Sequence, residues 1–443
     1  MNKYTEEDIR NIVVEDDVEF IRLQFTDIFG TLKNVAVTAS QLDRILNNRC
    51  KFDGAAIEGL VSEEESDVYL YPDLNSYNTF PWRPQQGKVA RIICDIKKPN
   101  GEALESDSRQ VLKRALAHAA EMGYTMTVGP ECEFFLFHTD EAGQPTTITH
   151  EKAGYFDLGP VDLGENTRRD MVLTLEEMGY EVVSSHHESA PAQHEIDFKY
   201  DEALTQADNI MTFKLAVKTI AKRHGLFASF MPKPKADCSG SGMHLNLNLT
   251  RDGVNVFRDP SDENGLSQEA RWFMGGIMKH IRCMTLFTNP LVNSYKRISG
   301  GMEAPKYITW SSSSRGPLIR VPSDRGGNTR IELRSPDPAA NPYLVLALCL
   351  EAGLDGIRNQ IEPPAETRLD LKKLTEQQAK EQGIGMLPMT LKEAIAAFEE
   401  DDFARRIVGE HIAETYVSAK KKEWEEYHRS ISEWELSEYL YKI

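Results

Sequence analysis

The first hundred residues carry apolar and polar side chains in alternation, which is the two-residue period of β-strands. This pattern predicts three strands, over residues 18–25, 33–37 and 89–96. Between them, residues rich in Pro, Asp, Asn and Gly predict a turn at 52–54 and loops at 71–75 and 81–84. Lys98-Pro99-Asn100-Gly101 ends the pattern, so the sequence predicts a small β-rich domain over residues 1–100 and a second domain over 101–443.

After residue 100, apolar positions recur every three to four residues, which is the period of an amphipathic helix. Three such stretches each end at a glycine, the residue that most easily takes the left-handed conformation beyond a helix. They predict helices over 108–122, 167–178 and 207–224, stopped by Gly123, Gly179 and Gly225. From residue 367 onward the pattern predicts mostly charged amphipathic helix.

Composition limits the classes of partner. The 443 residues are 40% hydrophobic and carry a formal net charge of −18. This acidity argues against a surface that binds nucleic acid or an anionic membrane, because phosphates attract a basic surface. The N-terminal residues hold no apolar signal segment, and no apolar run approaches the about 20 residues that span a bilayer. Six scattered cysteines predict reduced thiols and a cytoplasmic location.

Polar side chains occupy strand spacing inside stretches that are otherwise apolar. Four stretches show this pattern: Gly129–Phe137, His194–Lys199, His244–Leu249 and Arg330–Arg334. One interpretation is that each polar face is simply solvated, as in a half-exposed antiparallel sheet. The other is that the strands converge on one polar cavity, which the clustering of Glu, His and Asn favours over the Thr, Lys and Ser of ordinary surfaces.

If the strands converge, they assemble five carboxylates and one imidazole. The candidate metal ligands are Glu131, Glu133, Glu188, Glu195, His244 and Glu332. Carboxylates so close together need positive charge between them, and oxygen-rich ligand sets favour Mg²⁺ or Mn²⁺, here in more than one copy. Zinc is the competing metal because of His186, His187 and His194, but the sequence contains no HExxH motif.

A second feature is a local reversal of charge. Residues 296–334 hold eight basic side chains and three acids, a net charge of +5 within a chain of −18. Most of the basic residues are arginines, which form paired hydrogen bonds with phosphate or carboxylate. Arginines beside divalent metals are typical of phosphoryl transfer. Neither a Walker A motif nor a GxGxxG motif is present, so a nucleotide would bind in a way other than a P-loop. The acids and arginines alone predict a metal-dependent enzyme acting on phosphate.

Several stretches together resemble one family, the bacterial type I glutamine synthetases. The matching motifs run in the family's order along essentially the whole chain: residues 52–54, 129–137, 186–198, 239–244, 293–297, 303–305, 317–320 and 335–343. The resemblance implies an α+β fold with an N-terminal β-grasp domain and a larger α+β catalytic domain. It also implies a homododecamer of two stacked hexameric rings, with active sites between neighbouring subunits.

The reaction that the resemblance implies joins ammonium to the γ-carboxylate of L-glutamate. ATP first activates the carboxylate as γ-glutamyl phosphate, and the products are L-glutamine, ADP and phosphate. Two or more Mg²⁺ or Mn²⁺ ions per site would serve as cofactors and ATP as a substrate. The chain resembles most the Gram-positive subfamily, which is not adenylylated and which contacts transcriptional repressors.

The resemblance also implies roles for individual residues. Glu133, Glu188 and Glu195 would hold one metal ion, and Glu131, His244 and Glu332 the other. Substrate glutamate would bind Arg297, Arg334 and the loop of Ser239 and Gly240, while Arg315 and Arg320 would stabilise the transferring phosphoryl group. Asn246 and Asn248 would contact the nucleotide, Glu303 would close a flap, and Asp53 would take a proton from ammonium across a subunit boundary.

The chain departs from the family's usual pattern at a few positions. Ser239 replaces a usual Asn, Ala192 a common Gly, and Ser62 a basic residue frequent in the Gram-positive subfamily. The flap reads Ser299-Gly300-Gly301-Met302-Glu303, where an aromatic residue preceded by Pro-Gly is usual. These departures leave feedback control open. They also leave two alternative functions open: a γ-glutamylpolyamine synthetase-type ligase that uses another amine, and a non-catalytic regulatory relative.

Overall fold

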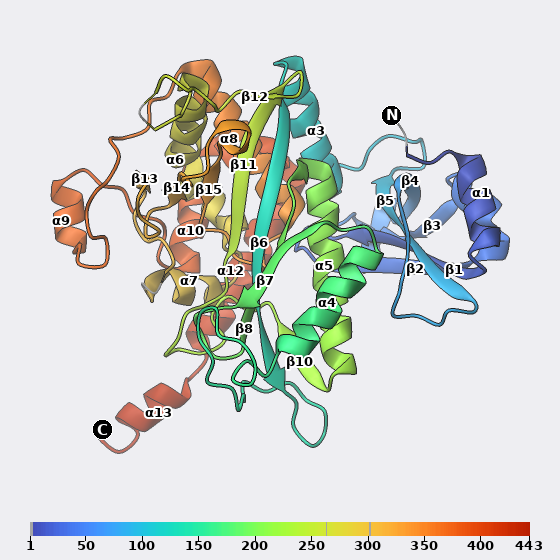
Figure 1. Ribbon diagram of the computed structural model, residues 1–443, viewed down its shortest axis with the longest axis horizontal. Coiled ribbons are helices and arrows are strands. Elements are labelled where there is room, and N and C mark those ends of the chain that lie inside the picture. The colour runs from blue at the N-terminus through green and yellow to red at the C-terminus, as the bar shows by residue number, and fades with distance from the viewer. Residues whose placement is uncertain (1–2, 263, 301–302) are drawn as a thin grey trace.

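The chain folds around two β-sheets, and helices cover the larger of them (Figure 1). The structure, a computed structural model, describes residues 3–262, 264–300 and 303–443. Each sheet has its own hydrophobic core, and the core of the second sheet also takes in Ile28 and Phe80 from the first hundred residues.

The first sheet has five strands in the order β2-β1-β5-β4-β3, with β1 and β5 parallel and the other pairs antiparallel. Its strands are β1 (Val18–Thr26), β2 (Leu32–Thr38), β3 (Cys50–Asp53), β4 (Asp67–Thr79) and β5 (Lys88–Lys97). Short helical elements complete this part: α1 (Glu6–Glu15), η1 (Ala39–Gln41), α2 (Leu42–Leu46), η2 (Gly54–Ala56) and η3 (Glu63–Glu65). The strands predicted over 18–25, 33–37 and 89–96 are therefore confirmed, as is the loop at 81–84.

The loop predicted at 71–75 is wrong, because these residues lie within β4. Pro72 and Asp73 suggested a break, yet the strand continues through them with an irregularity between Asp73 and Asn78. There a side chain replaces one backbone acceptor: the Ser76 hydroxyl donates to the Asp73 carbonyl and accepts from Ile93 N at 2.7 Å. Side-chain hydrogen bonds thus bridge a segment whose composition alone indicates a turn.

The second sheet carries the stretches with polar strand spacing. Its main order is β13-β14-β15-β11-β6-β8-β7, and short strands β9, β10 and β12 pair beside this path. The bounds are β6 (Thr125–His138), β7 (Val182–His187), β8 (Gln193–Phe198), β9 (Asp201–Glu202), β10 (Leu226–Ser229), β11 (Met243–Arg251), β12 (Val254–Asn255), β13 (Trp310–Ser311), β14 (Ile319–Arg320) and β15 (Ile331–Leu333). The strands β15, β11, β6 and β8 are consecutive neighbours, so the predicted convergence of the four polar stretches is confirmed.

Helices α3 (Ser108–Glu121), α4 (Glu165–Glu177) and α5 (Ala203–Arg223) confirm the three predicted helices. Gly123, Gly179 and Gly225 follow them with φ of 81°, 86° and 72°, the left-handed conformation that stops a helix. Further helices are α6 (Gln268–Thr288), α7 (Val292–Ser299), η4 (Gly326–Asn328) and α8 (Pro342–Asn359). The hydrophobic helices α6 and α8 belong to the second core.

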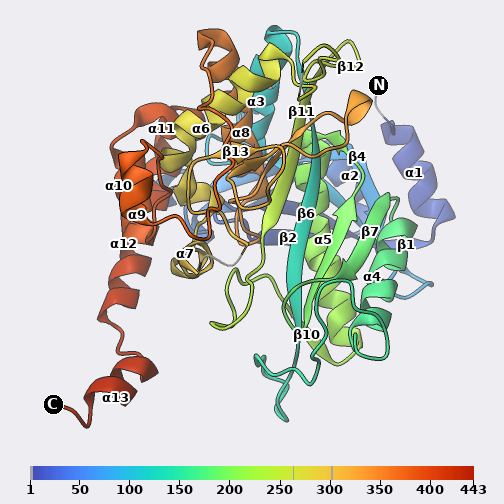
Figure 2. The same cartoon turned by 60° about the vertical axis from the view of Figure 1, so that its left-hand side comes forward.

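The C-terminal part is helical, as predicted, with α9 (Glu376–Glu381), α10 (Leu391–Glu399), α11 (Asp402–Val408), α12 (Glu410–Arg429) and α13 (Glu433–Tyr439). Figures 1 and 2 both show α13 projecting from the body of the chain. Its neighbourhood exposes large apolar side chains, with Trp434 62% and Tyr441 93% exposed. Among the described residues, no helix is both long enough and apolar enough to cross a membrane.

One buried arginine joins the two sheets. Arg109 lies in the first turn of α3, where the N-cap Asp107 accepts its backbone N–H at 3.0 Å. Its guanidinium reaches Asp73 on β4 at 2.7 Å and Asp95 on β5 at 2.6 Å, and it also reaches Asp208 on α5 at 2.9 Å. The Arg109 side chain is only 4% exposed, so the three carboxylates replace the water molecules that would otherwise solvate its charge.

We predict that Arg109→Ala destabilises the chain by about 3–5 kcal/mol, because three carboxylates lose their buried counter-charge. The measurement is the shift of the urea unfolding transition. Arg10→Ala is the matched control, since Arg10 pairs with Asp43 at the surface and should cost at most about 1 kcal/mol. Equal shifts for the two variants would contradict the role of Arg109.

Candidate active site

Strand register brings the candidate metal ligands together. His244 on β11 stands opposite Glu131 on β6, and Glu133 on β6 stands opposite Glu195 on β8. On the far side of β8, His186 of β7 is opposite Glu195. Residues two apart along one strand share a face, so a single face of the sheet collects these groups.

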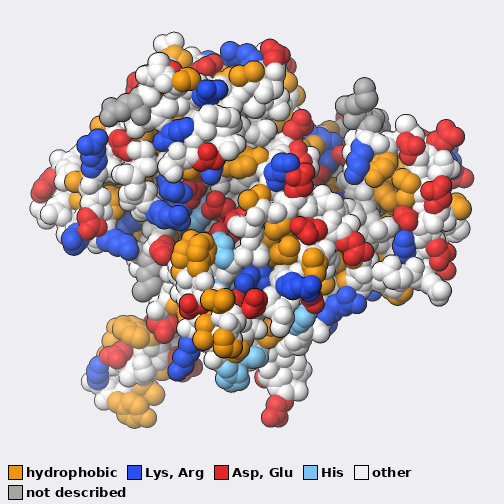
Figure 3. Space-filling view, in the orientation of Figure 1, with side chains coloured by type: hydrophobic (Ala, Val, Ile, Leu, Met, Phe, Trp, Pro, Cys, Tyr) orange, Lys and Arg blue, Asp and Glu red, His pale blue; other side chains and the backbone are white. Residues whose placement is uncertain are grey.

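Two adjoining cavities lie over this face, in the hollow where acidic, basic and histidine side chains meet in Figure 3. The larger measures about 1070 Å³ and the smaller about 570 Å³. They share Glu131, Tyr155, Glu195 and Arg315 along their common boundary. Two compartments separated by acids and an arginine suit two substrates that react across that boundary.

The predicted metal ligands form overlapping groups in which the ligand atoms lie within 4.8 Å of one another. Glu131, His244 and Glu332 make one group, with His244 Nδ1 3.3 Å from Glu131 and 3.8 Å from Glu332. Glu133, Glu195 and His244 make a second, and His186, Glu188 and Glu195 a third. All six predicted ligands therefore belong to one connected cluster, and His186 joins it as a seventh member.

Burial and mutual repulsion disfavour the ionised form of two carboxylates in this cluster. Burial, and then the charge of Glu188, raise the pKa of Glu133 to about 8. Burial and the neighbouring carboxylates also hold the pKa of Glu195 well above its usual range. Burial works against the Glu131 carboxylate too, but hydrogen bonds to His244 and Asn246 outweigh it and lower the pKa of Glu131 to about 2. A divalent cation would satisfy Glu133 and Glu195 without protons, and the donors are the oxygens and neutral imidazole that Mg²⁺ and Mn²⁺ accept.

Arginines neutralise the most buried carboxylate. Glu332, 1% exposed, pairs with Arg320 at 2.7 Å and also with Arg334. Arg334 and Arg297 line the larger cavity, Arg320 lines the smaller, and Arg315 lines both. The positive segment predicted from the sequence thus lines the same two cavities as the acidic cluster, which is an arrangement that binds phosphate beside metal ions.

The Gly240-Ser241-Gly242 loop passes unusually close to the site. A side chain at Gly242 would lie 2.6 Å from Arg297 Nη2 and 2.8 Å from His244 Nε2, and one at Gly240 would lie 2.2 Å from the Pro232 carbonyl. Glycine is therefore needed at both positions because of space. The loop also holds a ligand in place, since Gly242 N donates to Glu133 Oε2 at 2.8 Å.

Other predicted residues do not line either cavity. Asn246 donates to Glu131 at 2.8 Å and so supports a ligand, while Asn248 hydrogen-bonds Thr127. Ser239 is half-buried outside the lining. Asp53 ends β3 in the first sheet, where its carboxylate accepts from Ala55 N at 3.0 Å. Its predicted role across a subunit boundary stays a prediction.

The flap residue Glu303 does reach the larger cavity, where its carboxylate accepts from the Ser189 hydroxyl at 3.3 Å. Glu303 is held at φ 63°, in the left-handed region. The flap positions Gly301 and Met302, predicted from the motif, lie outside the described residues.

Sequence reasoning missed several residues at the site. Tyr155 lines both cavities from the loop between β6 and α4, a segment without periodicity. Gln193, 1% exposed, donates from one amide to Glu133 Oε2 at 2.9 Å and to the Gly240 carbonyl at 3.1 Å. Of the three histidines considered for zinc, His186 joins the cluster of candidate metal ligands, whereas His187 and His194 lie in a separate group with Glu151 and Asp162. Gln193 carried one usable signal, its place at strand spacing from Glu195.

Comparison with known proteins identifies the family of the chain. Residues 17–99 match the family model "Glutamine synthetase, beta-Grasp domain", and residues 105–439 match "Glutamine synthetase, catalytic domain". A glutamine synthetase of Clostridium saccharobutylicum is 60% identical over 442 residues, covering 100% of both chains. One of Staphylococcus aureus (strain Mu50) is 52% identical over 438 residues, covering 99% of this chain and 98% of that protein.

Solved structures show the same fold. A GmaS/ADP complex superposes with a TM-score of 0.88 at 31% identity, covering 98% of this chain and 99% of that one. A Plasmodium falciparum glutamine synthetase superposes with a TM-score of 0.87 at 25% identity, covering 99% of each chain. The predicted fold class, a β-grasp domain followed by a larger α+β catalytic domain, is confirmed. Two family models that together span nearly the whole chain, and relatives at up to 60% identity, show that the chain belongs to the glutamine synthetase family.

Proposed function

We propose that the chain is a glutamine synthetase that joins ammonium to the γ-carboxylate of L-glutamate at the expense of ATP. Membership of the family and identity to glutamine synthetases over the full length support this reaction. The observation that carries it is the set of carboxylates and arginines that lines the two adjoining cavities. A γ-carboxylate oxygen attacks the γ-phosphorus of ATP and releases ADP, and ammonia then displaces phosphate from γ-glutamyl phosphate.

Two metal ions, Mg²⁺ or Mn²⁺, fit the donor sets. We assign Glu131, His244 and Glu332 to one ion and Glu133, Glu188 and Glu195 to the other, with His186 close to the second set. When bound, such ions neutralise phosphate oxygens and polarise the group under attack. The raised pKa values of Glu133 and Glu195 support the assignment, since burial and the charge of neighbouring carboxylates both disfavour their ionised forms.

The arginines divide between binding and charge stabilisation. Arg297 is anchored by backbone carbonyls, donating to Ser335 O at 2.8 Å and to Arg334 O at 3.1 Å. We assign Arg297 and Arg334, with the Gly240 loop, to the carboxylates of glutamate. Arg315 is exposed at the boundary of the two cavities and Arg320 lies in the smaller one, where both can follow the phosphoryl group as it moves.

The remaining roles concern protons and water. We assign Glu303, which lines the larger cavity, to the flap that shields the acyl phosphate from hydrolysis. Ser239 would support the glutamate loop, and Asn246 and Asn248 would support the nucleotide side of β11. Asp53 of a neighbouring subunit would accept a proton from ammonium, since within its own chain it belongs to the first sheet.

We propose that the chain assembles as a homododecamer in the cytoplasm, divided into domains at residues 1–100 and 101–443. The projecting α13, with its exposed apolar side chains, supports a subunit contact (Figure 2). Six free cysteines, five of them buried, suit a reducing compartment. Contact with transcriptional repressors stays a prediction of the subfamily resemblance.

Metal removal tests the cofactor assignment. We predict that chelation of the purified chain abolishes ATP-dependent phosphate release, because Glu133, Glu188 and Glu195 then repel one another and the phosphates. Mg²⁺ or Mn²⁺ should restore the rate, measured as phosphate released in the presence of glutamate and ammonium. Restoration by Zn²⁺ and not by Mg²⁺ or Mn²⁺ would contradict the choice of metal.

Replacement of one ligand tests its placement. Glu332→Ala should lower turnover by about 100-fold or more, since it removes a ligand and leaves Arg320 and Arg334 unpaired. γ-Glutamyl hydroxamate formation gives the measurement. Glu181→Ala is the control, because Glu181 pairs with Lys199 at the surface, and it should leave the rate within about twofold. Unchanged turnover in Glu332→Ala would refute the site, and inactivity of the wild-type chain would favour a regulatory relative.

Amine competition separates the two ligase functions. Full-length identity to glutamine synthetases favours ammonium over a polyamine. We predict that kcat/KM for phosphate release is at least about tenfold higher with ammonium than with putrescine. A clear preference for putrescine would overturn the proposed function.

A further inference from the structure

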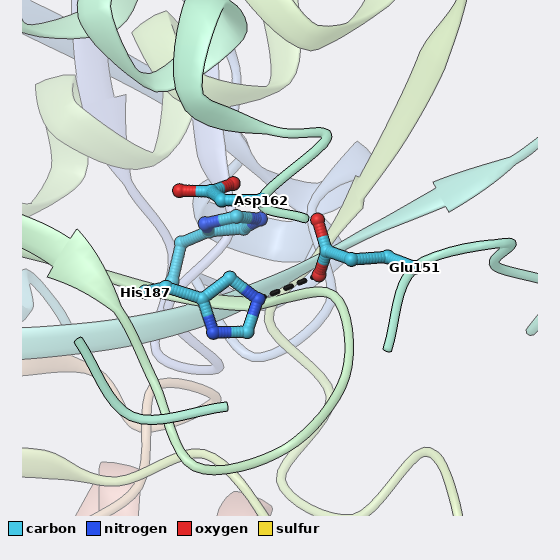
Figure 4. A group of neighbouring side chains, drawn as sticks. Glu151, Asp162 and His187 are labelled. Atoms are coloured by element: carbon cyan, nitrogen blue, oxygen red, sulfur yellow. Dashed lines mark hydrogen bonds and ion pairs between the residues drawn. The ribbon is translucent and has the colours of Figure 1, made fainter. Parts of the chain in front are cut away.

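A single buried carboxylate, Glu151, accepts four hydrogen bonds next to the metal cluster. Its Oε1 accepts from His187 Nε2 and from Ala192 N, both at 2.6 Å, and Figure 4 shows the contact with His187. Its Oε2 accepts from Leu163 N at 2.8 Å and from Gly164 N at 3.2 Å. Glu151 is 6% exposed, so these four donors take the place of water around it.

These contacts tie together two separate segments. The pair at Oε2 closes the loop of residues 151–164, which carries Tyr155 to the cavities. The pair at Oε1 holds the turn between β7 and β8, the turn that begins with Glu188 and leads to Glu195. His187 links Glu151 to the start of the turn, since its Nδ1 lies 2.6 Å from the Glu188 carbonyl oxygen. Phe156 N adds a bond to the His187 carbonyl at 3.1 Å.

The turn needs such support because of Ala192. This residue has φ of 69°, in the left-handed region that costs a side chain about 1 kcal/mol or more relative to glycine. Its peptide is held on both sides: the N–H donates to Glu151, and the carbonyl accepts from Leu136 N at 2.9 Å. Glu188 N and Gln193 O then pair at 2.8 Å and place the carboxylate of Glu188 at the end of the hairpin.

The group around Glu151 has the residue types of a metal site, but its positive charge is already present. Arg168 lies 2.9 Å from Asp162 and 2.8 Å from His194 Nδ1. Both oxygens of Glu151 and both ring nitrogens of His187 have hydrogen-bond partners. Glu151 and His187 are therefore committed to contacts that hold the hairpin.

We propose that Glu151 is a positioning residue that sets the metal affinity of the Glu133, Glu188 and Glu195 site, by holding the β7–β8 turn against the strain at Ala192. The inference rests on the proposed function, which makes Glu188 and Glu195 metal ligands. It assigns Glu151 no contact with metal or substrate.

The test is Glu151→Gln in the full-length chain, with Mn²⁺ as the probe and no substrate present. Glutamine has the size of glutamate but only one oxygen that accepts hydrogen bonds. The variant therefore loses either the two bonds at Oε2, from the loop, or the two bonds at Oε1, from the turn. Free Mn²⁺, measured by electron paramagnetic resonance during titration, should show dissociation constants about 10- to 100-fold weaker than in the wild type. The melting temperature is recorded in parallel.

A rescue variant separates positioning from general stability. Glycine adopts the conformation of Ala192 freely, so Glu151→Gln/Ala192→Gly should recover part of the lost Mn²⁺ affinity. Glu165→Gln is the matched control, since the exposed Glu165 accepts from Gly159 N at 3.0 Å in the same loop and lines neither cavity. Its Mn²⁺ affinity should equal that of the wild type.

The outcomes are distinct. Wild-type Mn²⁺ affinity in Glu151→Gln, even with a lower melting temperature, would overturn the inference alone, and so would a failure of Ala192→Gly to rescue. Lack of Mn²⁺ binding by the wild type, or unchanged binding in Glu188→Gln, would overturn the proposed metal site itself. If Glu151→Gln does not fold, His187→Asn replaces it, because it loses only the Nε2 bond to Glu151, and unchanged affinity there would overturn the inference.

Discussion

The repulsion among carboxylates crowded on one face of a sheet governs this structure. Glu131, Glu133 and Glu195 stand on adjacent strands with the register that makes them neighbours, and burial deprives them of water. Such a cluster is stable only if positive charge lies within a few ångströms. Arginines supply it on the Glu332 side, and we propose that divalent cations supply it on the Glu133 side.

The surrounding fold holds the clustered charges in place. Backbone pairing fixes the positions of the candidate ligands along β6, β8 and β11. Gln193 and the Gly242 amide hydrogen-bond Glu133, and Asn246 hydrogen-bonds Glu131. Among the arginines, Arg320 lies on β14, Arg297 on α7, and Arg334 directly after β15. Chemistry at the boundary of the two cavities therefore uses groups whose positions are set before any substrate binds, which lowers the reorganisation needed for reaction.

Residues with a local pattern could be predicted from the sequence. Alternation marked the polar faces of β6, β8, β11 and β15, and glycines marked the ends of α3, α4 and α5. The roles of Asp53 and Glu303 came only from family resemblance, because a turn acid and an exposed glutamate have no local signature. The places of Tyr155 and Glu151 could not be predicted from the sequence, because tertiary hydrogen bonds determine the conformation of an irregular loop. The loop predicted within β4 was wrong for a related reason. The Ser76 side chain forms hydrogen bonds with the backbone there, and the composition of the segment gives no sign of them.

The bridge at Arg109 has a consequence for motion. A hinge opening between the first sheet and the helices α3 and α5 would pull one guanidinium away from carboxylates on β4, β5 and α5, and Asp208 would then be buried without its counter-charge. The bridge therefore opposes a hinge motion at this point of the chain. The loop of residues 151–164 is fastened in the same way, because Asp162 pairs with Arg168 at 2.9 Å and Glu151 with His187 at 2.6 Å, and all four side chains are buried.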